Sequence, residues 1–147
     1  LFATGVCVVS AMTPSGEPMG LTVNSFSSVS LNPPLILWSL DKGSDTMPVF
    51  EAVTAFTMNV LGEMDKDLSQ RLSRKGHHGL QAGEWIAGAT GAPVLKTAIA
   101  HFDCVLSARH DGGDHVILVG EVKAHAHKDS AHPLLYYRGR YRELSAL

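Results

Sequence analysis

Short apolar runs alternate with turn-forming segments along the first third of the chain. The valine-rich run 4–11 predicts a β-strand, and segment 12–20, which is rich in proline and glycine, predicts a hairpin turn. Segment 20–31 then predicts the return strand. Pro33 and Pro34 end it, because proline cannot donate a hydrogen bond to a sheet.

The following stretch predicts a strand and then a short helix. Run 35–40 is almost entirely apolar, which predicts a strand buried on both faces. Segment 42–53 predicts a turn and a short helix, with Ser44 or Asp45 as the N-terminal cap and Pro48 in the first turn.

The remainder of the chain predicts further strands, a second helix and a long loop. Segment 76–95 holds five glycines with little periodicity, and loops of this length are often functional or mobile. The other predicted elements are a strand at 55–61, a charged helix at 65–75, a strand at 97–110, a tight turn at 111–114, its hairpin partner at 115–127 and a short closing strand at 133–144.

These elements together define a fold class. Six or seven short strands with two short helices favour a mainly β fold, an antiparallel barrel that is closed or partly closed. The 147 residues contain no internal repeat or low-complexity tract, and we expect one domain over residues 1–147. The first residue is not Met, and we expect a few residues upstream.

Composition excludes several function classes. Net charge is −2, with 45% hydrophobic and 18% charged residues, which does not favour nucleic acid or an anionic membrane as a partner. No apolar run approaches the roughly 20 residues of a spanning helix. Cys7 and Cys104 lie far apart in apolar surroundings, so we expect free thiols in a reducing compartment, the cytoplasm.

Common nucleotide and hydrolase motifs are missing. The sequence has no GxGxxG after a strand, no GxxxxGK[ST] and no GxSxG, and its acids form no obvious glycosidase pair. Eight histidines are present, but we see no convincing set of three metal ligands and predict no metal site.

Small hydrogen-bonding side chains crowd the predicted return strand, with no charge among them. They occupy six of the nine positions 22–30, and the next turn adds Ser39, Lys42, Ser44 and Thr46. Several neutral donors that converge near a helix start can hold a phosphate. The alternative is a solvated sheet face, and the residues alone leave both interpretations open.

The sequence also resembles a known family. The blocks "FATGVCVVSA", "GLTVNSFSSVSLNPPLILWSL", "GDHVILVGEV" and "PLLYYRGRYREL" are similar, in order and spacing, to flavin reductases with the FMN-binding split-barrel fold. The resemblance covers nearly the whole chain and implies an antiparallel, Greek-key-like split β-barrel. It implies hydride transfer from NADH or NADPH to FMN or FAD, chemistry that the flavin itself carries.

The resemblance implies roles for individual residues. The implied flavin-binding residues are Thr22, Val23, Asn24, Ser25, Ser39, Leu40, Asp41, Ser44 and Thr46. Gln70 and Ser73 occupy a region that approaches the flavin in relatives. Asp41 either caps the following turn or faces the phosphate and weakens flavin binding.

Four residues of the "DH" and "YYRGRY" blocks are implied near the nicotinamide. His115 would be the catalytic residue, next to the nicotinamide or flavin, unless it only hydrogen-bonds its own turn. Tyr137 and Arg138, with Tyr141, would bind cofactor, unless they form an aromatic edge of the core.

The family further implies partners. We expect a homodimer that passes reduced flavin transiently to a monooxygenase. Two alternatives remain: a non-catalytic flavin- or haem-binding module of the same barrel, and an enzyme like pyridoxamine-phosphate oxidase, for which the sequence shows no basic cluster.

Overall fold

The computed structural model describes residues 1–145. Strands dominate this range, with two short α-helices and one 3-10 turn, Glu63–Asp65. The strands and helices are β1 (Thr4–Gly5), β2 (Cys7–Met12), β3 (Pro18–Val23), β4 (Ser27–Leu31), β5 (Pro34–Asp41), α1 (Met47–Ala52), β6 (Ala55–Val60), α2 (Lys66–Leu72), β7 (Trp85–Ala87), β8 (Pro93–Leu95), β9 (Ala100–Gly112), β10 (His115–His127), β11 (Leu135–Tyr137) and β12 (Arg140–Arg142). The predicted mainly β fold is confirmed.

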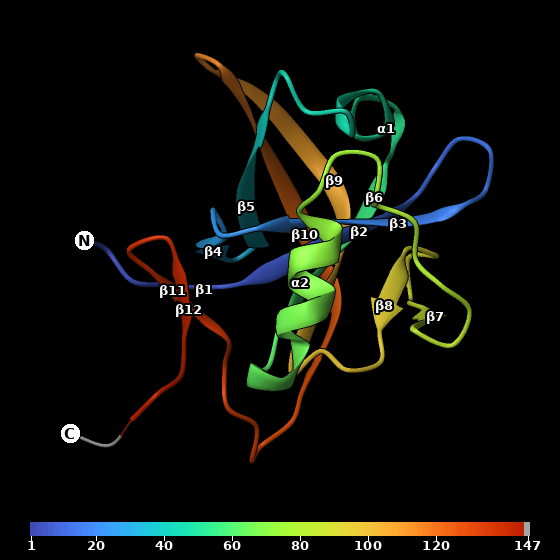
Figure 1. The fold of residues 1–147 in the computed structure, drawn as a ribbon. Helices are drawn as coiled ribbons and strands as arrows, with labels where there is room; N and C mark the ends of the chain where they lie inside the picture. The colour runs from blue at the N-terminus through green and yellow to red at the C-terminus, as the bar shows by residue number, and fades with distance from the viewer. Residues whose placement is uncertain (146–147) are drawn as a thin grey trace.

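A curled antiparallel sheet organises the molecule. Its strand order is β3-β2-β6-β9-β10-β5-β4, so β3 and β4 form the two edges although they are consecutive in the chain (Figure 1). Only residues 24–26 join them. So short a link spans at most about 14 Å, which brings the two edges of the sheet together. The curled sheet is the arrangement that a split barrel needs.

The inner face of this sheet carries the main core. Strand β5 places Ile36, Trp38 and Leu40 inside, whereas Leu35 and Leu37 on the other face are only half-buried. The prediction that this strand is buried on both faces is therefore wrong, because its apolar residues serve two different surfaces.

A second, smaller core lies between α2 and a three-stranded sheet, β1-β11-β12. Val6, Leu72 and Leu134 are buried there, with Tyr136 and Tyr141 packed against them. Figure 1 shows this small sheet close to the chain's beginning. No helix within residues 1–145 is long and apolar enough to cross a membrane.

Several element predictions need correction. The predicted return strand divides into β3 and β4, the loop 76–95 contains the hairpin β7–β8, and the closing strand 133–144 is a hairpin. Its turn places Arg138 at φ +52°, next to Gly139. Helix α1 starts after Thr46 without a side-chain cap, so neither Ser44 nor Asp45 caps it.

Candidate functional site

A cavity of about 250 Å³ opens where the polar end of β3 meets α2 and the C-terminal hairpin. Its lining residues are Val6, Thr22, Val23, Asn24, Ser73, Tyr136 and Tyr141. Three of the predicted flavin contacts are therefore neighbours in one cavity, and none of the lining side chains is charged. We call this the β3–α2 cavity.

Hydrogen bonds hold the three walls of this cavity together. Thr22 Oγ1 donates to the Ser69 carbonyl at 2.7 Å, which fixes β3 to α2. The Ser69 hydroxyl lies 2.8 Å from the Tyr141 hydroxyl, which fixes α2 to β12. Tyr141 also meets Tyr136 edge to face, with ring centroids 5.6 Å apart. The cavity is consequently a built feature of the fold rather than a gap between loops.

Ser25 connects this cavity to the second predicted segment. Its hydroxyl donates to the Ser39 carbonyl at 3.2 Å and accepts from the Ser39 amide at 2.9 Å. One side chain thus satisfies both main-chain groups of Ser39, as a neighbouring strand would. Ser25 therefore holds the Ser39 end of β5 against the segment that joins β3 and β4.

Polar side chains in the turn after β5 make hydrogen bonds within the turn itself. Asp41 Oδ1 accepts from the Gly43 amide at 2.7 Å, the turn-capping arrangement. The hydroxyls of Ser44 and Thr46 lie 2.8 Å apart, and Thr46 is almost fully buried. Leu40 belongs to the core, so only its main chain is available to a ligand.

Thr46 also reaches a second cavity, of about 460 Å³, on the other side of the α2 C-terminus. Asp45, Gly76 and His78 line it together with the β2–β3 hairpin. Ser73 lines the first cavity and Gly76 the second, so the chain just after α2 separates the two.

His115 lies at the tip of the β9–β10 hairpin, directly opposite Asp41 of β5. Its Nδ1 atom is 2.7 Å from Asp114, so it does hydrogen-bond its own turn. That hydrogen bond and the histidine charge lower the pKa of Asp114. Beside them Lys42 pairs with Asp111. His115 is therefore next to the predicted Ser39–Asp41 segment, with its Nε2 atom available for another partner.

Tyr137 and Arg138 do not line the β3–α2 cavity. The Arg138 guanidinium instead stacks 5.4 Å from the centroid of Tyr137. Because successive residues of a strand face opposite sides, Tyr136 faces this cavity and the predicted cofactor-binding residue Tyr137 does not. Tyr136 and Val6 are the lining residues that the sequence did not indicate, whereas Ser73 lies in the region expected to approach the flavin. Strand periodicity could have identified Tyr136, whereas Val6 is brought in by tertiary packing.

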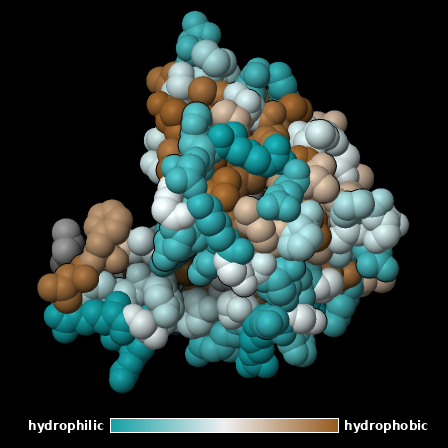
Figure 2. Space-filling view, turned by 90° about the horizontal axis from the view of Figure 1, so that it is seen from above, coloured by the Kyte–Doolittle hydropathy of each residue, from teal (hydrophilic) through white to brown (hydrophobic). Residues whose placement is uncertain are grey.

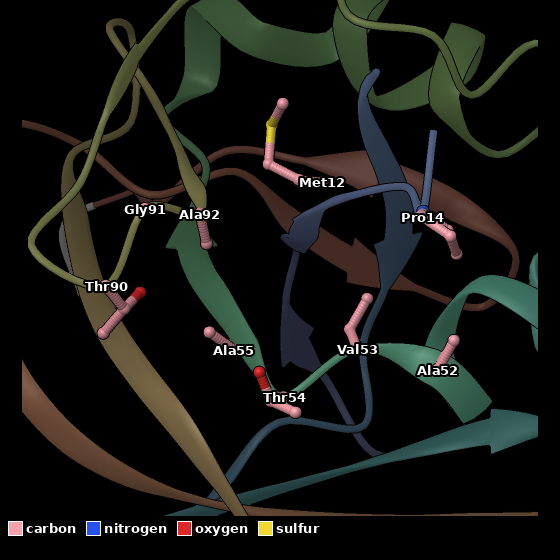
Figure 3. Close-up of a pocket in the computed structure, with 9 residues that line it drawn as sticks. All are labelled: Met12, Pro14, Ala52, Val53, Thr54, Ala55, Thr90, Gly91 and Ala92. Atoms are coloured by element: carbon pink, nitrogen blue, oxygen red, sulfur yellow. The ribbon is translucent and has the colours of Figure 1, made fainter. Parts of the chain in front are cut away.

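Another cavity, of about 410 Å³, contains none of the predicted residues. Figure 3 shows Met12 and Pro14 of the β2–β3 hairpin on one side of it and Thr90–Ala92, between β7 and β8, on the other. Residues 52–55 complete the lining, and its side chains carry no charge. It offers nothing that matches the chemistry predicted from the sequence.

Cysteine and metal chemistry do not contribute to these cavities. Burial raises the pKa of both Cys7 and Cys104 to about 12, the latter with help from the nearby Asp103 charge. Within residues 1–145, no group of three His, Cys, Asp or Glu side chains could hold a metal ion.

Comparison with known proteins identifies the family. The model of the flavin reductase like domain matches residues 1–145, so the chain belongs to this family. It is 45% identical over 144 residues to the FMN reductase (NADH) SmoA of Agrobacterium fabrum, a match that covers 98% of this chain and 81% of that protein. It is 34% identical to a flavin reductase of Pseudomonas putida, with 99% and 86% coverage.

Solved structures agree with this assignment. The NADH:FAD oxidoreductase SgcE6 of Streptomyces globisporus, in complex with NAD and FAD fragments, superposes with a TM-score of 0.90 at 32% identity and covers 98% of this chain and 87% of its own. The styrene monooxygenase flavin reductase of Pseudomonas putida S12 has a TM-score of 0.88 at 32% identity, with 100% and 95% coverage. The resemblance seen in the sequence is confirmed.

Proposed function

We propose that this protein is a flavin reductase that transfers hydride from NADH or NADPH to FMN or FAD and supplies reduced flavin to a monooxygenase. The observation that carries the proposal is the uncharged, tyrosine-walled β3–α2 cavity in a chain of this family. Relatives named reductase subunits of flavin-dependent monooxygenases support the supply role.

The residues present fit a flavin. Tyr136 and Tyr141 offer aromatic surface to a planar ring, and the exposed Asn24 amide can both donate and accept hydrogen bonds. At about 250 Å³ the cavity is smaller than the roughly 300–1,000 Å³ typical of small-molecule sites, so it would take the ring portion alone. The phosphate end would extend along β5 to the hydroxyls of Ser44 and Thr46.

The flavin, when bound, supplies the hydride-accepting centre, and the chain supplies position and polarity. Asn24 and the main chain of 22–25 would orient the ring edge, and Ser25 would keep Ser39 and Leu40 in place through its two hydrogen bonds. Asp41 shapes the turn through Gly43, so we assign it to turn capping rather than to phosphate repulsion.

His115 is the residue we assign to the nicotinamide side. Its pairing with Asp114 orients the ring and leaves Nε2 free, opposite the Ser39–Asp41 segment. Tyr137 and Arg138 would contact the same nucleotide from outside the β3–α2 cavity.

A steady-state assay tests the function directly. We expect NADH oxidation that requires added FMN or FAD and saturates with flavin, because the flavin would be a substrate. Repeating the assay with NADPH and with each flavin ranks the four combinations. Flavin that stays bound without NADH oxidation would instead indicate a non-catalytic binding module and would overturn the proposal.

We also propose a homodimer formed through the outer face of the curled sheet. Leu35 and Leu37 of β5 and Ile117 and Val119 of β10 are half-buried on the side away from the main core. Val119 pairs with Leu37, so the apolar surface is continuous from β10 to β5 at this point, whereas Glu121 lies between Leu35 of β5 and the exposed Val105 of β9. We place the protein in the cytoplasm, because Cys7 and Cys104 are both free thiols.

A further inference from the structure

Three acceptors surround the imidazole ring of His78. Nδ1 lies 3.2 Å from the Gly20 carbonyl and 3.1 Å from the Leu72 carbonyl, and Nε2 lies 2.9 Å from Asp45 Oδ1. The side chain is only 11% exposed, so water cannot easily replace these partners. A neutral imidazole has one N–H and can donate on one side only, whereas the imidazolium donates on both. The geometry therefore favours the doubly protonated ring.

Each acceptor belongs to a different element. Gly20 is on the edge strand β3, and its amide already donates to the His78 carbonyl at 2.8 Å, so His78 occupies both free main-chain groups of this edge residue. Leu72 is the last residue of α2, where carbonyls lack partners within the helix. Asp45 belongs to the turn before α1. A single side chain thus joins β3, α2 and that turn.

Asp45 is held from two sides. Its Oδ2 atom accepts from the Gly76 amide at 2.7 Å, while Oδ1 faces His78. Desolvation by burial is the largest single influence and raises the pKa of Asp45, but the hydrogen bonds from Gly76 and His78 and the histidine charge together lower it. Among the described residues that line the same cavity, Glu17 of the β2–β3 hairpin is the other titratable group, while β3 and α2 present neutral carbonyls to the ring.

Asp45 lies between the two hydroxyl residues that we assign to the flavin phosphate. Ser44 Oγ accepts from the Thr46 amide at 3.2 Å, and the two hydroxyls lie 2.8 Å apart, so the turn is one hydrogen-bonded unit. Fixing the carboxylate of Asp45 therefore limits how far Ser44 and Thr46 can move. If the ring lost a proton, it would have to give up either the carbonyl pair or the carboxylate.

We propose that protonated His78 is a positioning residue that holds the Ser44–Thr46 turn in its flavin-binding arrangement, so that flavin affinity decreases when His78 loses its charge. The inference rests on the proposed function, because it takes the phosphate group of the flavin as the ligand of that turn. His78 touches neither reactant; it acts through Asp45.

The neighbouring His77 offers a matched control. It is exposed, and the same histidine-to-glutamine change can be made there. We would measure FMN affinity by fluorescence quenching for the unmodified chain, His78→Gln and His77→Gln, between about pH 5.5 and 8.5, where histidine changes charge. The phosphate of free FMN also titrates in this range, but the free ligand is the same in all three measurements.

The proposal gives a definite expectation. At low pH, His78→Gln should bind FMN about tenfold more weakly, the effect of one hydrogen bond to a charged group, and its affinity should vary less with pH than that of the unmodified chain. His77→Gln should match the unmodified chain. Equal pH profiles for all three proteins would overturn the proposal. A second variant, Asp45→Asn, keeps the turn's size but removes its charge and should also weaken FMN binding at low pH.

A separate measurement isolates the histidine. In ¹⁵N-labelled protein without flavin, both ring nitrogens of His78 should carry protons at low pH, and this signal should be absent from His78→Gln. A neutral ring at low pH would overturn the inference even if the reductase is active. Loss of the reductase function itself would appear as no flavin-dependent NADH oxidation by the unmodified chain, a result that leaves the ¹⁵N signal unaffected.

Discussion

At Gly120 on β10 the fold has no room for a side chain. A Cβ there would lie 2.5 Å from Phe56 Cζ and 2.8 Å from Cys104 Cβ, both in the fully buried core. Neither neighbour can move far, because Phe56 lies on β6, Cys104 lies on β9, and the two residues are paired in the sheet. We expect Gly120→Ala to lower the free energy of unfolding by about 1–3 kcal/mol, the usual cost of overpacking.

Urea unfolding measures this change. Gly5→Ala is the matched control, since a Cβ there meets nothing within 4 Å. If both variants were equally stable, the close packing of Phe56 against β10 would be wrong.

The two thiols should be inert in the native protein. Burial raises the pKa of Cys7 and Cys104 to about 12, so almost no thiolate is present near neutral pH. A thiol reagent at about pH 8 should label neither residue in the native protein. After denaturant is added, both should react as exposed cysteines do, because their pKa then returns to about 8.5. Mass spectrometry would count the labels, and rapid native labelling of either residue would contradict this expectation.

The structure brings predicted site residues together where they are consecutive on one strand. Thr22, Val23 and Asn24 share one cavity, as a single ligand-facing segment would. Leu40 and Tyr137 show the limit, because a one-residue step along a strand exchanges core and surface. The pattern around them is apolar or aromatic at successive positions and does not reveal which residue points inward.

The chain just after helix α2 lines both cavities with Ser73 and Gly76, and an ion pair ties α2 to the segment before β7. Arg71 lies 2.7 Å from Glu84, whose Oε2 also accepts from the Gln81 amide. Partial desolvation raises the pKa of Glu84, but the hydrogen bonds from Arg71 and Gln81 and the arginine charge together hold it below its ordinary value. A carboxyl group whose pKa is lower in the folded state stabilises the fold at pH values above its unfolded-state pKa. This stabilisation is lost as the pH falls through the folded-state pKa.

We therefore expect the melting temperature to fall between about pH 5 and 3, and to fall less in Glu84→Gln, which cannot titrate. At neutral pH the same variant should be the less stable protein. Thermal melts across this range test both statements. Glu63→Gln, at an exposed position, is the control. Identical pH profiles for Glu84→Gln and the unmodified chain would rule out this role of the ion pair.

Element predictions worked for long segments and failed for short ones. The strands β9 and β10 and both helices were found, because each carries a strong pattern or clear turn residues. The three-residue strands β7 and β8 were missed, because so short a run has no detectable period. The break between β3 and β4 was missed because Ser25 satisfies main-chain groups of β5 by a tertiary contact.

At the scale of the whole molecule, the hydrophobic pattern of the sequence predicted the fold class but not the order of the strands in the curled sheet. Fold class followed from counting strands and turns, but strand order depends on contacts between distant segments, such as β2 with β6 and β5 with β10. Curling also gives the sheet an inner face, which holds the core, and an outer face. Seen from above, the surface of the molecule has hydrophobic residues scattered among hydrophilic ones (Figure 2).

The outer apolar face of the curled sheet needs a partner that buries it. Leu37 and Val119 are cross-strand partners on this face and pack against neither core, so a second subunit is the occupant that would bury them. We expect the unmodified chain to be a dimer at micromolar concentration and Leu37→Asp to be a monomer, because the dimer would place two unpaired carboxylates in an apolar contact. Light scattering measures the mass directly. Met64→Asp, at an 89% exposed apolar position on another element, should remain dimeric. A monomeric unmodified chain would disprove the dimer, whereas a dimeric Leu37→Asp would place the interface elsewhere.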